Sequence, residues 1–303
     1  MSVVPEPFAK TITNTFGADG SAWLQRLPKL LTEFAQRWSL TILPHFSNLS
    51  YNYVAPAIQS DGAEVILKLC VPISEMLTEL NALRLYDGRG ICRLLDADEA
   101  QGAMLLERLK PGVMLATVTD DVEATAIAAQ VMRQLWRPAP AEHSFPTVAK
   151  WSQGLERLRK RFDGGTGPFP VRLVEEAERL FTELIPTMGE PVLLHGDLHH
   201  YNILQAEREP WLAIDPKGVV GEPAYEIGAL LRNPFEIDKR PDLVEFTTRR
   251  IDQLAAELKV DRSRIRGWNV AQAVLSVWWD YEDNGDNWPQ GIAFAEQMAN
   301  VKE

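Results

Sequence analysis

The stretch "LLHGDLHHYNILQ", residues 193–205, concentrates reactive side chains within a short predicted loop. It holds three of the five histidines of the chain, one aspartate among them and one asparagine after them. Three interpretations fit the stretch taken alone, namely a metal-binding cluster, a phosphoryl-transfer loop and a histidine-rich turn without chemistry. Residues elsewhere in the chain must therefore decide between them.

A zinc centre is the weaker of the two chemical interpretations. The His and Asp side chains of the stretch are suitable zinc ligands, but a hydrolase would need further ligands from elsewhere. The remaining histidines, His45 and His143, lie far upstream in loop-like surroundings. Neighbouring residues at this spacing also cannot easily converge on one ion without a tailored turn. A zinc hydrolase, if present, would carry stoichiometric zinc.

The phosphoryl-transfer interpretation accounts for residues outside the loop. His195, Asp197 and Asn202 match the pattern H-x-D-x-x-x-x-N, in which the Asp accepts the proton of the substrate hydroxyl and the Asn holds a metal. The apolar run "PVLL" predicts a strand before the loop, and "ILQ" predicts one after it. A second metal-binding aspartate should follow on the next strand, and "WLAIDP" supplies Asp215 there. We therefore predict that Asp197 is catalytic and that Asn202 and Asp215 bind Mg²⁺, which prefers few protein ligands beside phosphate oxygens and water.

A phosphate-binding lysine is predicted upstream, on a strand. Lys68 is the one cation of the apolar run "VILKLC", where an unpaired charge would be costly. Its partner should be a carboxylate on the following helix, and Glu75 and Glu79 both qualify because their spacing puts them on one helical face. The alternative for each residue alone is an exposed edge-strand lysine beside two solvated glutamates.

The predicted elements form an α+β lobe followed by a mostly helical lobe. The chain has 303 residues and 46% hydrophobic content, which suffices for two lobes. The predicted boundary lies near residues 107–114, so that 1–108 form the N-terminal lobe and 109–303 the C-terminal lobe. The elements expected in the first lobe are a helix over 19–37 kinked at Pro28, antiparallel strands within 38–46, 50–58 and 64–70, a helix over 73–86, and two strands within 92–109; a helix over 119–136 opens the second lobe.

Composition limits the partners and the compartment. The net charge of −11 and the absence of a Lys/Arg block argue against nucleic acid as a partner, whereas an acidic surface would suit a cationic small molecule. Cys70 and Cys92 form no CxxC pair, which favours a reducing compartment. No signal-peptide pattern and no apolar run of the length of a membrane helix occur. We expect a cytoplasmic protein without a membrane partner.

The motifs together resemble a known family. "HGDLHHYNIL" followed by "IDP" is similar to the signature of the aminoglycoside phosphotransferases, and "EVILKL", "AMLLERLKPG" and "IDPKGVVGEPAYEIGALLRNP" resemble their streptomycin 6-kinase and hydroxyurea phosphotransferase branch. The similarity runs from about Trp23 to Trp288. It implies a bilobal protein-kinase-like fold, with a small N-terminal lobe built on an antiparallel sheet and a larger helical C-terminal lobe, and it implies the cofactors ATP and Mg²⁺. The pattern E-x-x-A-L-R implies Glu79 as the partner of Lys68, and "LLERL" implies a hinge whose backbone near Glu107 and Leu109 meets adenine.

Two departures from protein kinases bear on the substrate. "SNLSYNYV" stands where protein kinases have a glycine-rich loop, so backbone N–H groups and Ser47, Asn48 or Ser50 would contact phosphate. Gly196 replaces the arginine of H-R-D, and the next predicted helix begins within about ten residues of Asp215. No long activation segment remains to hold a peptide, so we expect a small hydroxyl compound and no protein substrate.

Five residues are candidates for contact with the substrate, namely Lys217, Glu222, Asp280, Glu282 and Asp283. Lys217 follows the metal aspartate and would touch transferred phosphate or pair with an acid. Glu222 begins a predicted helix, where an acid also suits the helix dipole. The resemblance implies that Glu226 supports the catalytic loop from behind. The other candidates come from the run "VWWDYEDNGDNW", residues 277–288, whose acids are Asp280, Glu282, Asp283 and Asp286.

The run 277–288 has two readings. Its three tryptophans and four acids could bind a cation by aromatic faces and carboxylates. Core tryptophans beside a solvated acidic turn would give the same pattern. We take Asp280, Glu282 and Asp283 as predicted substrate contacts.

The sequence thus favours an ATP- and Mg²⁺-dependent kinase of a small molecule, with an aminoglycoside such as streptomycin as acceptor and antibiotic resistance as the implied outcome. The nearest alternative is a kinase of an amino alcohol or a sugar. A nucleotide-binding protein without transferase activity is the alternative from another class. His195 is expected to brace the loop, and His199 and His200 to pack within it.

Overall fold

The computed structural model describes residues 4–283 and 288–301. They divide into two compact units, residues 1–112 and 113–303, whereas the sequence placed the boundary after residue 108. Each unit is described by itself. Of the predicted acids, Asp286 lies outside the described residues.

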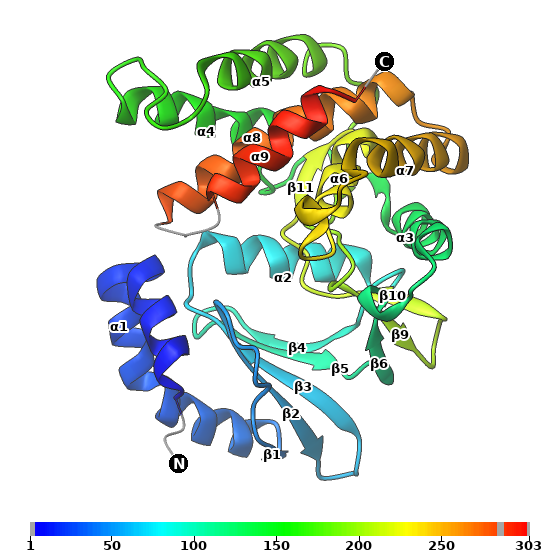
Figure 1. Ribbon diagram of the computed structural model, residues 1–303. Helices are drawn as coiled ribbons and strands as arrows, with labels where there is room; N and C mark the ends of the chain where they lie inside the picture. Colours follow the sequence, from blue (N-terminus) through cyan, green and yellow to red (C-terminus); the bar gives the residue numbers. More distant parts are fainter. Residues whose placement is uncertain (1–3, 284–287, 302–303) are drawn as a thin grey trace. The chain divides into compact units, whose positions relative to one another are not determined.

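A five-stranded antiparallel sheet organises the first unit. Its strands are β1 (Leu40–Ile42), β2 (Tyr53–Gln59), β3 (Glu64–Leu69), β4 (Leu94–Asp98) and β5 (Ala103–Glu107), in the spatial order β1-β2-β3-β5-β4. The central position of β3 gives both of its edges a partner (Figure 1). The predicted strands of this region are all present. A helix, α2 (Ser74–Tyr86), joins β3 to β4 as predicted.

The first helix is longer than its pattern indicated. We expected a helix over 19–37 kinked at Pro28, but α1 spans Glu6–Arg37 and its non-helical residue is Gly17. Gly17 has a φ of 54°, a left-handed conformation that glycine adopts at little cost. The break therefore occurs where the backbone is permissive, and the predicted kink at Pro28 is wrong.

Strand alternation separates the two faces of this sheet. Leu67 and Leu69 of β3 lie in an apolar core, to which α1 contributes side chains such as Trp23 and Leu27. Successive side chains of a strand point to opposite faces. Lys68, between the two leucines, therefore points to the other face.

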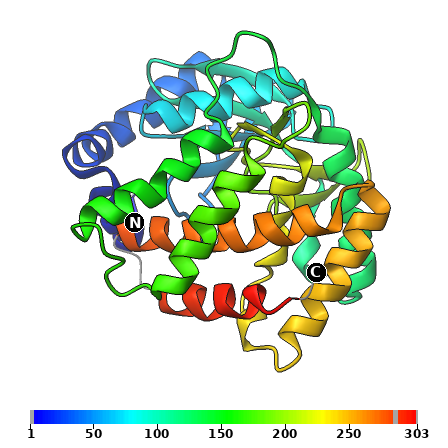
Figure 2. The ribbon, with the colours of Figure 1, turned by 90° about the horizontal axis from the view of Figure 1, so that it is seen from above.

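The second unit is mostly helical. The long helix α8 runs through it and contacts α4, α5, α6, α7 and α9, and Figure 2 shows α8 and α9 side by side. Strands β8 and β11 form one antiparallel pair and β9 and β10 another. Its elements are η1 (Leu115–Thr117), α3 (Asp121–Leu135), β7 (Arg137–Pro138), α4 (Val148–Arg161), α5 (Val171–Leu184), β8 (Val192–Leu194), β9 (Ile203–Ala206), β10 (Trp211–Ala213), β11 (Val219–Gly221), α6 (Pro223–Leu231), η2 (Ile237–Lys239), α7 (Leu243–Leu258), α8 (Arg262–Glu282) and α9 (Trp288–Ala299), and β6 (Pro111–Met114) lies at the boundary of the units.

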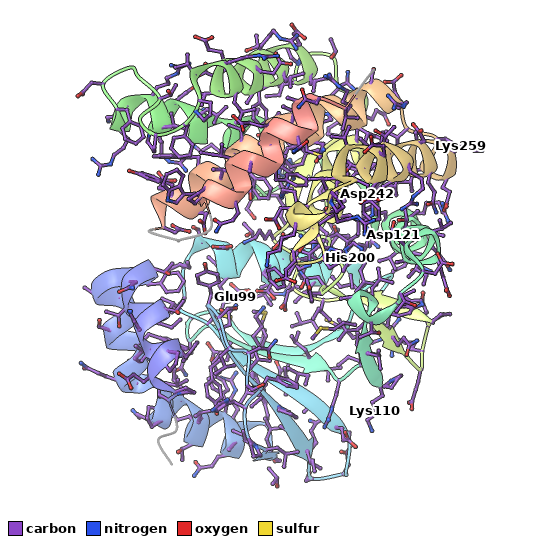
Figure 3. The ribbon with its side chains drawn as sticks, in the orientation of Figure 1. Glu99, Lys110, Asp121, His200, Asp242 and Lys259 are labelled. Carbon is purple, nitrogen blue, oxygen red and sulfur yellow. The ribbon has the colours of Figure 1, made fainter. Side chains whose placement is uncertain are left out.

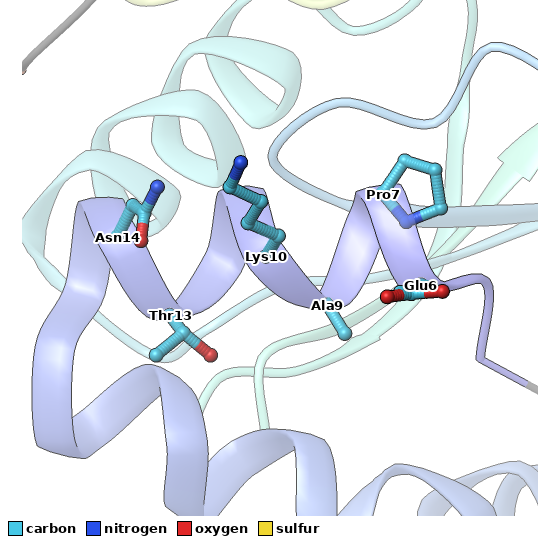
Figure 4. Close-up of a pocket in the computed structure, with 6 residues that line it drawn as sticks. All are labelled: Glu6, Pro7, Ala9, Lys10, Thr13 and Asn14. Carbon is cyan, nitrogen blue, oxygen red and sulfur yellow. The ribbon is translucent and has the colours of Figure 1, made fainter.

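Two surface features complete the description. None of the helices in the described part of the chain is both long and apolar enough to cross a membrane. A shallow depression of about 620 Å³ lies on α1 and is lined by Glu6, Lys10 and Asn14 among others (Figure 4). It contains none of the predicted site residues.

Candidate functional site

In the first unit, the predicted lysine has a carboxylate partner. Lys68 Nζ lies 2.5 Å from Glu79 Oε1, and the two residues are 2% and 8% exposed. Glu75, one turn earlier on α2, is exposed. Burial of both charges is tolerable because each neutralises the other and they are hydrogen-bonded. The structure therefore pairs Lys68 with the buried Glu79, whereas Glu75 lies at the surface.

The other residues predicted in the first unit have ordinary surroundings. Ser47 is exposed in the turn between β1 and β2. The Glu107 N–H donates to Arg93 O at 2.9 Å, so this backbone donor already has an acceptor. Leu109 is buried at 8% exposure. Contact of these three residues with a nucleotide stays a prediction.

In the second unit, the loop from β8 to β9 is held by the imidazole of His195. The Asp197 N–H donates to His195 Nδ1 at 3.2 Å, so Nδ1 carries no proton and Nε2 donates to Ile214 O at 2.7 Å. Burial lowers the pKa of His195 to about 4, so the ring is neutral at neutral pH. His195 thus ties the loop to the end of β10, in agreement with the bracing role predicted for it.

A buried carboxylate supports the same loop from α6. Glu226 is 1% exposed, and its two oxygens accept the N–H groups of His195 at 2.6 Å and of Gly196 at 2.9 Å. Burial raises the pKa of Glu226 to about 7, although these backbone donors and that of Leu198 lower it. The support that the resemblance implied for Glu226 is therefore present as backbone hydrogen bonds.

The loop leaves the Asp197 side chain accessible. This side chain is 36% exposed, and the His199 ring is close by, with Nε2 3.9 Å from Asp197 Oδ1. The Tyr201 N–H donates to His199 Nδ1 at 3.2 Å, so the proton of neutral His199 sits on Nε2, the nitrogen nearer Asp197. A carboxylate that is both fixed at its backbone and accessible can accept a proton from a bound hydroxyl.

The two predicted metal ligands come from neighbouring strand ends. The Asn202 side chain donates through Nδ2 to Asp197 O at 2.9 Å, which leaves its amide oxygen as the group that could bind a cation. Ile214 N donates to Asn202 O at 3.0 Å, so Asp215 follows directly on the residue bonded to Asn202. Asp215 has a φ of 57°, a conformation uncommon outside special turns. One amide oxygen and one carboxylate fit Mg²⁺, whose remaining ligands are phosphate oxygens and water.

A protein-only metal centre has no support in the structure. Within residues 4–283 and 288–301, no three His, Cys, Asp or Glu side chains form a group that could hold a metal ion. The histidines of the loop are instead engaged in hydrogen bonds within the protein. The zinc interpretation of the stretch 193–205 is therefore not favoured.

A second network fixes the far side of the loop, and the sequence analysis missed it. The buried Arg250 of α7 pairs with Asp121 at the start of α3 and donates to Asn233 O at 2.7 Å and to His200 Nε2 at 3.2 Å. Asp121 and His200 are labelled in Figure 3. Burial and Arg250 lower the pKa of His200 to about 3, so this histidine is a neutral acceptor. Asp121 reads in the sequence only as a helix-start acid, so no local signal pointed to the network.

These residues also border a small pocket. It has a volume of about 230 Å³ and includes Asp121, His200 and Arg250 in its lining. Phe246 contributes an aromatic wall, with the guanidinium carbon of Arg240 3.9 Å from the ring centroid. The charges around this pocket are already paired within the protein, which fits a structural role.

Two predicted substrate contacts already have partners in the protein. Glu222, 6% exposed, accepts from Arg264 and from the indole N–H of Trp268, both on α8. Glu282 forms a two-point ion pair with Arg157 of α4, at 2.8 and 2.7 Å. The substrate roles of these two acids stay predictions, and the structure gives each carboxylate a structural partner.

The remaining candidates lie at the loop and at the end of α8. The Lys217 N–H donates to His195 O at 2.8 Å, which places this residue beside the loop. Asp280 is partly exposed in the last turns of α8, and Asp283 caps that helix and is exposed. Substrate contacts of Lys217, Asp280 and Asp283 stay predictions.

Comparison with known proteins adds three findings. Residues 38–284 match the family model described as aminoglycoside/hydroxyurea antibiotic resistance kinase. The chain is 34% identical over 282 residues to the streptomycin 6-kinase of Streptomyces glaucescens, covering 92% of this chain and 91% of that protein. It is also 34% identical over 290 residues to the hydroxyurea phosphotransferase of Kitasatospora aureofaciens, covering 93% and 82%.

The fold has solved counterparts. A crystal structure of an aminoglycoside phosphotransferase in complex with ADP and hygromycin B superposes with a TM-score of 0.62 at 14% identity, over 92% of this chain and all of that one. At this identity the likeness establishes the fold alone. The predicted α+β, protein-kinase-like fold class is thereby confirmed.

Proposed function

Because this chain belongs to the aminoglycoside/hydroxyurea antibiotic resistance kinase family, we propose that it transfers the γ-phosphate of ATP to a hydroxyl group of a small molecule. The observation that carries the proposal is the loop of the second unit. There a fixed but accessible carboxylate, Asp197, precedes Asn202 and Asp215 on a hairpin. These are the residue types that phosphoryl transfer needs, in the order that kinases use.

The first unit supplies the charge that orients ATP. Lys68 is held on its strand by Glu79 and would contact the α- and β-phosphates. In the second unit, the amide oxygen of Asn202 and the carboxylate of Asp215 would hold Mg²⁺. A bound Mg²⁺ neutralises charge on the phosphate oxygens. Positioning and charge neutralisation supply most of the acceleration in such reactions.

Asp197 acts on the acceptor. Its carboxylate accepts the proton of the acceptor hydroxyl while that oxygen forms a bond to the γ-phosphorus. The bond from the γ-phosphorus to the bridging oxygen of ATP breaks, and ADP leaves with that oxygen. Glu226 and His195 hold the loop so that the carboxylate does not move during this exchange.

The acceptor that we propose is an aminoglycoside such as streptomycin, so that the reaction would inactivate an antibiotic. The support is the identity to a streptomycin 6-kinase over nearly the whole of both chains. The net charge of −11 is in keeping with a cationic acceptor. We further propose, from the composition, that the protein acts in the cytoplasm.

The test is ADP release from Mg·ATP with a panel of hydroxyl acceptors, with streptomycin, hydroxyurea, an amino alcohol and a sugar as members. Asp197→Ala is the control, because it removes the proposed proton acceptor and leaves the loop backbone in place. Turnover of streptomycin that depends on Asp197 would support both the reaction and the acceptor. Turnover of another member would keep the reaction and exclude this acceptor, and ATP binding without turnover across the panel would contradict the transferase proposal.

A further inference from the structure

An aromatic ring, the indole of Trp151, lies against the catalytic loop at Gly196, the residue before Asp197. Gly196 has a φ of 84°, and a methyl group added to it would lie 2.9 Å from Trp151 Cη2 and 3.0 Å from Val219 Cγ1. A Cβ atom essentially never has a contact below 3.0 Å, and contacts of 3.0–3.4 Å are uncommon. The glycine that replaces the arginine of H-R-D therefore leaves room for the Trp151 indole against the loop.

The position of Trp151 is fixed by the start of α4. Thr147 caps this helix by accepting the N–H of Lys150 at 3.1 Å, and it forms a parallel bridge to Val220 of β11. A methyl group at Gly221 would lie 2.4 Å from Val148 Cγ2, so the first turn of α4 is tight against that strand. The helix thus cannot withdraw from the loop without breaking these contacts.

A second indole stands at right angles to the first. The rings of Trp151 and Trp279 have centroids 5.4 Å apart and an interplanar angle of 85°. Gly154, one turn after Trp151, allows this approach, because a methyl group there would lie 2.6 Å from Leu275 Cδ1 of α8. Trp151 and Trp279 are both partly exposed, whereas the neighbouring Trp278 is buried.

We propose that Trp151, with Trp279 set perpendicular to it, forms an aromatic wall of the acceptor site against which a cationic group of the acceptor stacks. The proposal rests on the proposed function and names the substrate class that its site selects. The face of an indole attracts ammonium and guanidinium groups, and the interaction strengthens as water is excluded. Asp197 follows Gly196 in the loop and Asp280 follows Trp279 on α8, so acidic residues adjoin both contacts of the wall, and negative charge favours a cation.

The wall selects the acceptor and does not take part in proton transfer. Its loss should therefore raise the KM for a cationic acceptor more than it lowers kcat. For Trp151→Leu we expect the KM for streptomycin to rise by about 3- to 30-fold, the range that a cation–π contact supplies. Trp151→Phe retains an aromatic face and should recover most of this loss.

The experiment measures ADP release by the whole protein with streptomycin as acceptor, for the wild type, Trp151→Leu, Trp151→Phe and Trp279→Leu. Val171→Ala is the matched control, because Val171 is an apolar residue 55% exposed on α5, outside the proposed machinery. A thermal melt of each variant separates lost binding from lost folding. If Trp151→Leu does not fold, Trp151→Phe and Trp279→Leu carry the comparison, with smaller expected rises in KM.

A competition assay on the wild type tests the charge without any variant. Methylguanidinium, a planar cation, and methylurea, its uncharged analogue, are compared as inhibitors against streptomycin. We expect methylguanidinium to compete at least 3-fold more strongly. Equal inhibition by the two compounds, or an unchanged KM in a folded Trp151→Leu protein that turns over streptomycin, would overturn the wall while leaving the kinase intact. Absence of turnover by the wild type with every acceptor would overturn the proposed function, and the wall with it.

Discussion

Two buried carboxylates, one in each unit, are stabilised in different ways. Glu79 on α2 meets the ammonium group of Lys68 at 2.5 Å, so two opposite charges are buried together. Glu226 on α6 instead accepts backbone N–H groups, those of His195 and Gly196 at 2.6 and 2.9 Å and that of Leu198. The charge of Glu79 is neutralised, whereas the charge of Glu226 is only solvated by dipoles. The pKa of Glu226 is accordingly raised to about 7 by burial.

This difference indicates which kind of change should destabilise each unit. A buried ion pair is costly to break because the remaining partner keeps an uncompensated charge. A carboxylate held by backbone N–H groups can instead take up a proton and remain in place. The stability of the first unit should therefore fall when one partner of the ion pair is removed. The stability of the second unit should depend on pH.

The largest effect on stability is expected when the ion pair is broken on one side. Lys68→Met removes the ammonium group that lies against the buried Glu79 carboxylate, and we expect a loss of about 3–5 kcal/mol in the free energy of unfolding. The double variant Lys68→Met/Glu79→Leu should recover most of this loss, because it removes both charges. Urea denaturation of the three proteins measures the effect. A single variant as stable as the wild type would show that the pair is not a buried charge site.

The pH dependence of stability tests the other carboxylate. The folded-state pKa of Glu226 is raised, so its contribution to stability is full below the unfolded pKa near 4.5 and is lost as the pH rises through about 7. Between pH 4.5 and 7.5 this costs the wild type about 3 kcal/mol. Glu226→Gln does not titrate and should lack this loss.

Comparing the wild type with Glu226→Gln cancels the contributions of the other titrating groups to the pH dependence of stability. The pKa values of His195 and His200 are lowered by burial, to about 4 and about 3, so these groups destabilise the protein as the pH falls below their unfolded pKa near 6.5. Both proteins contain these histidines, so the difference between their denaturation curves isolates Glu226. Parallel curves from pH 4.5 to 7.5 would contradict the assignment.

A smaller effect on stability is expected at Gly196, whose N–H donates to Glu226 and which directly precedes Asp197. Gly196→Ala places a methyl group in a left-handed backbone conformation and against Trp151, and we expect a loss of about 1–3 kcal/mol. The kcat should fall as well, because Asp197 follows directly. Gly62→Ala is the matched control, since Gly62 has a φ of 87° in a turn where a methyl group would meet no atom within 4 Å. Equal losses in the two variants would show that the Trp151 contact is unimportant.

The smallest effect is expected at a surface ion pair. Arg157 and Glu282 lie at 2.7 Å, but their side chains are 50% and 34% exposed. Solvent screens such pairs, so Arg157→Ala should cost about 0–1 kcal/mol. Thermal melts at low and high salt measure it. A loss as large as that of Lys68→Met would contradict the expectation that a buried ion pair contributes more to stability than an exposed one.

Much of the fold follows from local patterns in the sequence. Apolar runs and turn residues predicted the strands of the sheet and the helix over 73–86, because side-chain period and turn chemistry are local properties. The first helix shows the limit of such patterns. It was predicted to begin at residue 19, whereas it continues across Gly17 to Glu6, since a glycine leaves both continuation of a helix and a turn open.

The sequence by itself determined the order of the chemical residues along the chain. Spacing singled out Asp197, Asn202 and Asp215, and a cation inside an apolar strand singled out Lys68. Each of these signals depends on residues close in sequence or on the cost of burying a charge. Such signals can be read without knowing which helices touch.

Only the tertiary structure decided which distant side chains meet. The contacts of His200 with Arg250, of Glu222 with Arg264 and of Gly196 with Trp151 join residues dozens of positions apart. Each contact depends on how two helices, or a helix and a loop, approach one another. This approach is set by the packing of whole helix faces, which the spacing of residues along the sequence does not reveal.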